Sequence, residues 1–439
     1  MGAPESSDHE TVGPLRLDIP TLPSLSSFGC SGGRNEFRRF CEAILAGGTP
    51  RFLRTDDNRL VVFRHADLRA MAVLPELGNV PSGVLAARAR ADVDAGGRYA
   101  GAAMVEVFAN QFFFTNEPIH TPLRRMTLGQ IGPKRMPEME SIARSCIRRM
   151  LGETAKDTRI DFVQDVAVKL TVGFWGELLG LTVDEMAALA PIVRLMSAAF
   201  SARLDIAELR IADEAFSAYR ALIEGAALRS LAAGSRPFVS DLSAELARID
   251  LQGDPESIGI VPANVGAMLA GLLTDGFHTT AAAAVNAVWV LARHPDALAE
   301  VRANPRLLPA SIAEAWRLEP PALMFNSYAV GDIAYDGFLI PKGTGLLMMW
   351  GAGNHDPRAF PDPGRFDLSR GGQGLTTFGG GAQICPGRHV AAMLTRLLIE
   401  GLEAAGLTVE PTNEADAWVE GQILSELRSF PVRLKPTPR

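Results

Sequence analysis

The order of apolar and polar positions divides the chain into a long helical middle part and flanking parts with short strand-like runs. From about Pro118 to Ala303, apolar residues recur at intervals of three and four positions, as in "MPEMESIARSCIRRMLGE" and "AFSAYRALIEGAALRSLAAG". The longest helical segment begins near Pro262 and continues to His294, where Pro295 stops it. At a rise of about 1.5 Å per residue, this segment predicts a helix roughly 50 Å long, enough to cross a domain.

The flanking parts predict a small amount of sheet. The segment "RFLRTDDNRLVVFRHADLRAMA" indicates a strand pair at 52–63 followed by a helix. After "SIAEAWRLEPP", the run "SYAVGDIAYDGFLIPKGTGLLMMW" alternates short apolar stretches with glycine and proline, and "SFPVRLKP" indicates a last strand. The pattern predicts a mainly α fold with a minor antiparallel β portion. We expect residues 1–20 to be a loose segment and residues 21–439 to form a single domain.

Composition and charge narrow the class of protein. The 439 residues are 47% hydrophobic, which allows a large core, and the net charge of −7 without a basic run argues against nucleic acid as a partner. The N-terminus has no signal-peptide pattern, and polar residues interrupt the most apolar helix, so we expect no membrane anchor. Scattered cysteines argue against a zinc site or a disulfide framework and favour a reducing cytoplasm; they are Cys30, Cys41, Cys146 and Cys385.

The stretch "TTFGGGAQICPGRHVA" at 376–391 places Cys385 between a glycine-rich bend and an amphipathic helix. Two interpretations compete: a buried structural cysteine, or a sulfur presented for chemistry. Unpaired N–H groups at a helix start lower the pKa of a thiol, and Pro386 suits the first helical turn. Gly379, Gly380 and Gly381 let the backbone bend around a bulky group and point N–H groups at the sulfur. The coincidence of these features favours the second interpretation.

The segment "FGGGAQICPG" resembles the heme-binding loop of the cytochrome P-450 superfamily, F-G-x-G-x-[HR]-x-C-x-G. The resemblance implies that the cofactor is heme b (iron protoporphyrin IX) and that Cys385 is the thiolate ligand of its iron, which favours O–O cleavage. It also implies the P-450 fold, with the long central helix over the heme. Gln383 departs from the pattern, because the family usually has His or Arg there. The matching positions are Phe378, Gly379, Gly381, Cys385, Gly387 and Ala391.

A second resemblance lies about seventy residues before the cysteine. "EAWR" gives Glu314 and Arg317, which alone would be an ordinary helix-surface ion pair. By resemblance they form the family's E-x-x-R helix, and Arg365 in "FPDPGRF" resembles the arginine that completes its network. The implied role is structural: a buried charge network that holds the region behind the heme.

A third resemblance concerns the heme propionates. "EPIHTPLRRM" can be interpreted as a helix start with a basic face, but it also matches P-x-H-T-x-L-R, in which the His and Arg contact the propionates. The implied contacts are His120 and Arg124, and arginine suits this role because it stays charged and binds a carboxylate bidentately. Gln383 and Ser327 stand where many relatives carry further cations.

The central helix carries "DGFHT" where the family has [AG]-G-x-[DE]-T, so Thr279 is retained but its acidic neighbour is replaced by His278. In one interpretation His278 relays protons together with Thr279, with Asp275 one turn away setting its tautomer. In the other, His278 faces a neighbouring helix as a hydrogen-bonded core residue. Asp275 is a candidate for contact with water or with a polar or cationic substrate group, because a charge there is costly unless paired.

The resemblance implies a heme-thiolate monooxygenase that activates O2 to oxidise a mostly apolar small molecule of secondary metabolism, of terpenoid or polyketide type. Electrons come from a ferredoxin and a ferredoxin reductase, and we expect a monomer. Two alternatives stay open: a heme-thiolate enzyme for coupling, rearrangement or dehydration, and a heme sensor or carrier. By analogy of position, the residues expected to line the substrate cavity are Phe277, Leu323, Met324 and Ile423.

Overall fold

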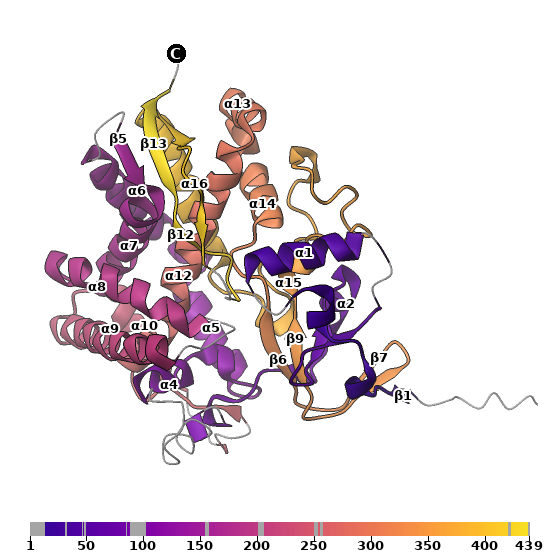
Figure 1. Cartoon of the computed structure of the whole chain (residues 1–439). Coiled ribbons are helices and arrows are strands. Elements are labelled where there is room, and N and C mark those ends of the chain that lie inside the picture. The colour runs from indigo at the N-terminus through magenta and orange to yellow at the C-terminus, as the bar shows by residue number, and fades with distance from the viewer. Residues whose placement is uncertain are drawn as a thin grey trace, which may run out of the picture.

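Helices form most of the structure, as the sequence predicts (Figure 1). The residues that this computed structural model describes are 14–30, 33–45, 47, 50–84, 86–87, 102–153, 158–200, 206–249, 253–254, 258–419 and 423–437. The helices are α1 Arg34–Leu45, α2 His65–Met71, α4 Ala102–Ala109, α5 His120–Ile131, α6 Met136–Gly152, α7 Lys169–Leu179, α8 Val183–Met196, α9 Ile206–Ala233, α10 Pro237–Leu246, α12 Val265–Ala292, α13 Pro295–Ala303, α14 Leu308–Leu318, α15 Trp350–Gly353 and α16 Arg388–Ala404.

The strands form small sheets, mostly antiparallel, which confirms the predicted fold class. A five-stranded sheet has the order β2-β3-β9-β6-β4, and smaller sheets have the orders β1-β8-β7, β10-β13-β5 and β11-β12. The pairs β3–β9 and β1–β8 are parallel. The strands are β1 Leu15–Arg16, β2 Leu53–Arg54, β3 Leu60–Val62, β4 Leu77–Gly78, β5 Thr158–Asp161, β6 Phe325–Ala329, β7 Ile333–Tyr335, β8 Phe338–Ile340, β9 Gly345–Met348, β10 Leu407–Pro411, β11 Ala417–Trp418, β12 Leu427–Ser429 and β13 Pro431–Pro436.

The predicted long helix is α12, which lies in the centre of the view in Figure 1. Asn264 caps its start, where the Asn264 side chain accepts a hydrogen bond of 2.9 Å from the backbone N–H of Ala267. Helices α4, α9, α14 and α16 pack around it. Because α12 is covered on several sides, its sequence is apolar nearly all round rather than amphipathic.

Part of the segment 1–20 that we expect to be loose has regular structure. Residues 1–13 lie outside the described part of the chain. Leu15 and Arg16 pair with Phe338 and Leu339 of β8, because the backbone N–H and C=O groups of this extended segment find partners on the open edge of that strand.

A cation–π and ion-pair cluster, the Arg34 clamp, joins α1 to the β11–β12 hairpin and to the end of α14. The Arg34 guanidinium carbon lies 3.8 Å from the centroid of the Trp418 ring. The same guanidinium donates two hydrogen bonds to the Glu319 carboxylate, at 2.6 and 3.0 Å. Trp289 of α12 packs edge-on against Trp418, with ring centroids 5.3 Å apart. The clamp therefore ties residues from both ends of the chain to the central helix.

No helix in the described ranges has the length and apolarity that crossing a bilayer requires. None of the four cysteines forms a disulfide bond in the structure.

Candidate heme site

Cys385 lies in the loop that connects the short 3-10 turn Gly381–Gln383 to α16. Its backbone N–H donates a 2.9 Å hydrogen bond to the carbonyl of Phe378, which closes the loop. Gly381 has φ +60°, and a Cβ placed there would lie 1.6 Å from the carbonyl oxygen of Ala72. Only glycine fits this contact, so the predicted close bend is required by the packing of the loop against the end of α2.

The environment of the Cys385 sulfur has opposing effects on its pKa. Burial raises the pKa of the thiol to about 11, and the carboxyl of Asp275 acts in the same direction. The N–H of Gly387 hydrogen-bonds to the sulfur and, together with the Arg388 and Arg124 cations, lowers the pKa. The sequence predicts this N–H contact, but burial outweighs it. The protein alone therefore keeps a thiol, and a thiolate here needs a strongly bound cation such as a metal.

Helix α5 brings His120 and Arg124 to the cysteine loop. His120 is 2% exposed, and its Nε2 is buried without a hydrogen-bond partner. Burial lowers the pKa of His120, although Glu117 and Gln383 lie close enough to raise it. Arg124 donates a 2.6 Å hydrogen bond to the carbonyl of Ile384, next to the cysteine. The structure thus brings His120, Arg124 and Gln383 together around the loop.

Arg388 is a member of the site that sequence reasoning missed. Its guanidinium donates a 3.0 Å hydrogen bond to the carbonyl of Cys385, and its charge lowers the pKa of Arg124. A cation in the first turn of a helix is unfavourable with respect to the helix dipole. The position of Arg388 at the start of α16 is therefore the sequence feature that could have revealed its role. Ser327, at the other position without the family's cation, lies half-buried in β6 opposite Leu346.

Asp275 and Thr279 lie one turn apart on α12, with Asp275 within electrostatic reach of Cys385, whereas Gly276 faces Trp175 of α7. All three are partly exposed, whereas most of the surrounding helix is buried. The Thr279 hydroxyl donates a 2.6 Å hydrogen bond to the carbonyl of Asp275. Burial raises the pKa of Asp275 to about 7, while His278 and the side chain of Gln111 lower it. Because Asp275 also raises the pKa of Cys385, its carboxyl and the sulfur lie within electrostatic reach of each other.

The His278 side chain does not share the face of α12 that carries Asp275 and Thr279. Its ring packs edge-on against Phe200, with centroids 5.2 Å apart, and its Nδ1 lies 3.9 Å from a carboxylate oxygen of Glu426. The ring is 3% exposed, and Nε2 makes no hydrogen bond. The two interpretations from the sequence are therefore both incomplete: His278 faces a neighbouring element, but it is not a fully hydrogen-bonded core residue.

The fold brings three of the predicted cavity residues together and separates Phe277 from them. Phe277 is 1% exposed and packs edge-on against Tyr219 of α9, on a different side of α12 from Asp275 and Thr279. Leu323 and Met324 are buried in a core cluster with α1 and the strand pair β2–β3, and Ile423 packs against the same cluster. The N–H of Leu323 donates a 2.9 Å hydrogen bond to the carbonyl of Ile423, which also contacts a small apolar cluster of Phe200, Ala322 and Leu424. Analogy of position was wrong for Phe277 because two residues along a helix turn a side chain by roughly 200°.

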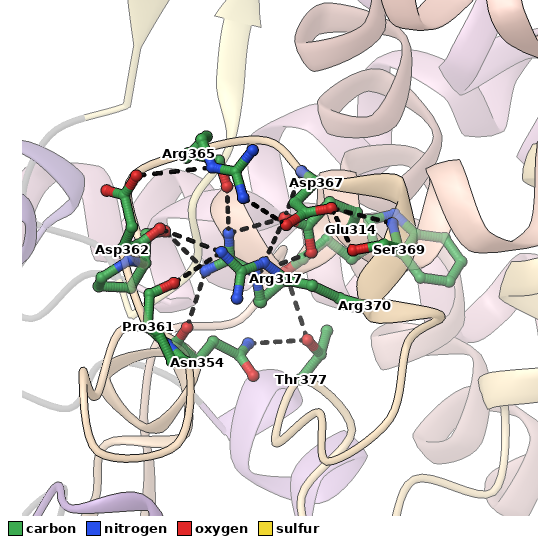
Figure 2. A network of polar contacts seen from close by, with 12 residues as sticks. Glu314, Arg317, Asn354, Pro361, Asp362, Arg365, Asp367, Ser369, Arg370 and Thr377 are labelled. Carbon is green, nitrogen blue, oxygen red and sulfur yellow. Dashed lines mark hydrogen bonds and ion pairs between the residues drawn. The ribbon is translucent and has the colours of Figure 1, made fainter.

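The Glu314–Arg317 pair is buried in α14, and Figure 2 shows its surroundings. Arg317 donates two 2.8 Å hydrogen bonds to Glu314 and reaches the carbonyls of Asn354 and Pro363. Arg365 contributes only its backbone carbonyl, which accepts a 3.0 Å hydrogen bond from Arg317.

The side chain of Arg365 is exposed and binds Asp367 and Asp362 instead of the buried pair (Figure 2). The second guanidinium beside Glu314 belongs to Arg370, whose Nε lies 3.4 Å from the carboxylate. The prediction that the Arg365 side chain completes the network is therefore wrong, because the meander turns Arg365 outward and Arg370 inward.

These residues fit a heme. A partly exposed cysteine, a partly exposed segment of α12 within electrostatic reach of its sulfur, and a glycine bend that a side chain would block suit a flat, iron-containing ring. The buried and unpartnered Nε2 of His120 and the guanidinium of Arg124 suit the acidic edge of such a ring. Phe378 packs edge-on against Trp316, which fixes the start of the loop.

Comparison with known proteins agrees with this site. The family model described as Cytochrome P450 matches residues 261–402, which include α12, α14 and the cysteine loop. "Cytochrome P450 144" of Mycobacterium tuberculosis is 30% identical over 287 residues, 65% of this chain and 64% of the relative. "Cytochrome P450 monooxygenase PikC" of Streptomyces venezuelae is 27% identical over 73% of this chain and 74% of its own length.

The fold is shared with solved structures as well. The structure of P450BioI, in complex with a hexadec-9Z-enoic acid ligated acyl carrier protein, superposes with a TM-score of 0.77 at 18% identity, covering 92% of this chain and all of the other. The fold, and the segment that carries α12, α14 and the cysteine loop, match those of cytochrome P450 proteins. The chain belongs to the cytochrome P450 superfamily. The match with the mycobacterial relative spans somewhat less than two thirds of that relative's length.

Proposed function

We propose that this protein is a heme-thiolate monooxygenase that oxidises a mostly apolar small molecule with O2. The observation that carries the proposal is the pairing of a half-buried Cys385 with a partly exposed segment of α12 whose Asp275 lies within electrostatic reach of the sulfur. Relatives named as a monooxygenase and as "6-deoxyerythronolide B hydroxylase" support the same class of reaction. Electrons come from a ferredoxin and its reductase, as the family resemblance implies.

In this proposal, Cys385 would hold a heme, which would supply the activation of O2 when bound. Gly387 and Arg388 stabilise the sulfur in its charged form. His120 and Arg124 would bind the propionates, with Arg124 also fixing the loop through Ile384. The Thr279 hydroxyl on α12 would deliver protons.

Asp275 accompanies Thr279 in place of the usual acid, three positions further from the threonine than in the family pattern. A pKa of about 7 suits a carboxyl that both accepts and releases protons near neutral pH.

The test is the spectrum of the reduced carbon-monoxide complex. The wild-type protein should show the red-shifted Soret band of a thiolate-ligated heme, and Cys385→Ala should lose it. A protein that purifies without heme, or one with histidine-type ligation, contradicts the proposal.

A second candidate is a heme-thiolate enzyme for coupling, rearrangement or dehydration. The observation that favours it is that His278, at the position of the family's acid, faces Glu426 rather than Thr279, so the usual proton delivery is altered. The mass of the product separates the two, since oxygen insertion adds one oxygen atom. A sensor or carrier would give no product and no substrate-dependent consumption of O2.

A further inference from the structure

His278 and Glu426 form a buried polar pair whose inner atoms have no partners. His278 comes from the middle of α12, and Glu426 directly precedes β12. Their closest atoms, Nδ1 and Oε1, are 3.9 Å apart. Nε2 of the ring and Oε2 of the carboxylate are both buried, and neither has a hydrogen-bond partner. Buried polar atoms without partners are rare in native structures, and they indicate a missing ligand or water.

The pair lies beside a small apolar cluster against which Ile423, one of the residues expected to contact substrate, packs. Phe200 covers the His278 ring and belongs to the small cluster with Ala322 and Leu424. The backbone N–H of Ile423 donates a 3.0 Å hydrogen bond to the carbonyl of Phe200, which holds the hairpin against this cluster. A mostly apolar molecule that contacts the cluster therefore meets the pair with its polar end.

The charge around the pair is negative. Asp275 lies on the same helix, within electrostatic reach of His278. Within the described ranges, no ion pair joins Asp275 or Glu426 to a lysine or arginine, although most other buried carboxylates, such as Glu314 and Glu319, have arginine partners. Two carboxyl groups and one imidazole leave a deficit of positive charge, which a cationic ligand would balance.

The chemistry of the two atoms narrows the ligand further. Nδ1 is the ring nitrogen 3.9 Å from the carboxylate, and in the tautomer with the proton on Nδ1 the other nitrogen, Nε2, is an acceptor. Oε2 of an ionised carboxylate is also an acceptor. Two unpartnered acceptors, one of them on a carboxylate, match a group that carries positive charge and two N–H donors.

We propose that His278 and Glu426 form a subsite that binds a primary or secondary ammonium group of an otherwise apolar substrate. Glu426 supplies the charge, and His278 accepts the second N–H. This inference rests on the proposed function, because it assigns the substrate class of the same site.

The test uses heme-loaded protein and a panel of matched probes. Dodecyl, adamantyl and naphthyl frameworks each carry either a methylamino group or the isosteric methoxy group, and binding is measured by calorimetry and by the Soret shift. With at least one framework, the amine should bind roughly tenfold or more tightly than the ether, in the range of one charge-assisted hydrogen bond.

Glu426→Gln keeps the size of the side chain, and it should reduce this preference to about threefold or less. Glu410→Gln removes one charge from an exposed side chain of β10 and should leave the preference unchanged. The carbon-monoxide band of each variant shows that the heme and its ligand are intact.

Three results would overturn the subsite: no amine binds, amines and ethers bind equally, or the preference persists in Glu426→Gln. The third result includes the case in which the variant retains a Soret shift to longer wavelength. Such a shift indicates that the amine nitrogen binds the iron. Any of these with a normal carbon-monoxide band leaves the heme-thiolate proposal intact. An abnormal band in the wild-type protein refutes that proposal as well.

Discussion

Asp275 carries a carboxyl group on a helix whose other side chains are mostly apolar. Its raised pKa reflects the free-energy cost of ionising the carboxyl in these surroundings. The folded state holds the Asp275 proton more tightly than the unfolded state does, because the folded pKa is about 7 and the ordinary value is 3.8. Between these two values the folded state binds more protons, so stability falls as pH rises through this window.

The first prediction concerns this pH dependence. Asp275→Asn removes the ionisable group, so its gain in stability over the parent should be small near pH 4 and largest above pH 7. From the pKa of about 7, the gain should be about 2–3 kcal/mol larger at pH 8 than at pH 5. Denaturant unfolding at the two pH values measures it. Asp18→Asn, an exposed site, is the control and should show no such change.

The second prediction concerns the hydroxyl opposite the cysteine. Thr279→Ala should lower the yield of product per O2 consumed several-fold, because the side chain that delivers protons is lost. Thr279→Ser keeps the hydroxyl and should retain most of the coupling. Parallel measurement of O2 uptake and product decides between them, and unchanged coupling in the alanine variant shows that Thr279 does not carry protons.

Whether the role of a residue could be predicted from the sequence depended on how far apart along the chain the contacting residues lie. Cys385, Gly381 and Phe378 lie in one short segment, so their roles could be assigned from sequence. Gln111 and Glu426 contribute through contacts that only folding creates: Gln111, in the connection after α4, reaches Asp275, and Glu426 meets His278 across 148 residues. No local spacing signals such pairs.

At the scale of elements, α14 is held by a charge pair that water does not reach. Arg317 and Glu314 are 0% and 1% exposed. Removing one member of a buried pair leaves the other charge without compensation, which costs more than the intact pair contributes.

The third prediction follows from this asymmetry. Arg317→Leu should lower the free energy of unfolding by roughly 3–5 kcal/mol. Arg365→Leu should cost less than about 1 kcal/mol, because its side chain is exposed and its carbonyl remains in place. Urea unfolding of both variants tests the pair. Equal losses in the free energy of unfolding would show that the Arg365 side chain belongs to the network.

The elements themselves were predicted with uneven success for a physical reason. The segment 262–294 became α12 because a long periodic pattern has few alternatives, and "SFPVRLKP" became β13. In the meander at 355–374, apolar and polar positions follow no regular period, so the sequence alone did not show which arginine turns inward. The choice between Arg365 and Arg370 is made by tertiary contacts with Glu314.

At the scale of the whole molecule, the Arg34 clamp connects segments that are about as far apart along the chain as residues can be. Arg34 lies in α1, Glu319 follows α14, and Trp418 lies in the hairpin that also carries Glu426. The hairpin therefore depends on α1 for its position.

The fourth prediction tests that dependence. Arg34→Gln should lower the free energy of unfolding by about 1–3 kcal/mol, through the lost cation–π contact and ion pair. It should also speed hydrogen exchange in β12, because the hairpin loses a support. Arg39→Gln changes an exposed arginine on the same helix and should do neither. Unchanged exchange in β12 would show that the hairpin is held without the clamp.

The clamp has a consequence for building chimeras from related proteins. An engineer who transplants the β11–β12 hairpin to alter substrate choice would move Trp418 and leave its stacking partner behind in the recipient. The minimal transferable unit is therefore discontinuous: it comprises the hairpin, the Arg34 turn of α1 and Glu319. Exchange of all three together should preserve the position of the hairpin relative to α12, whereas exchange of the hairpin alone should change it.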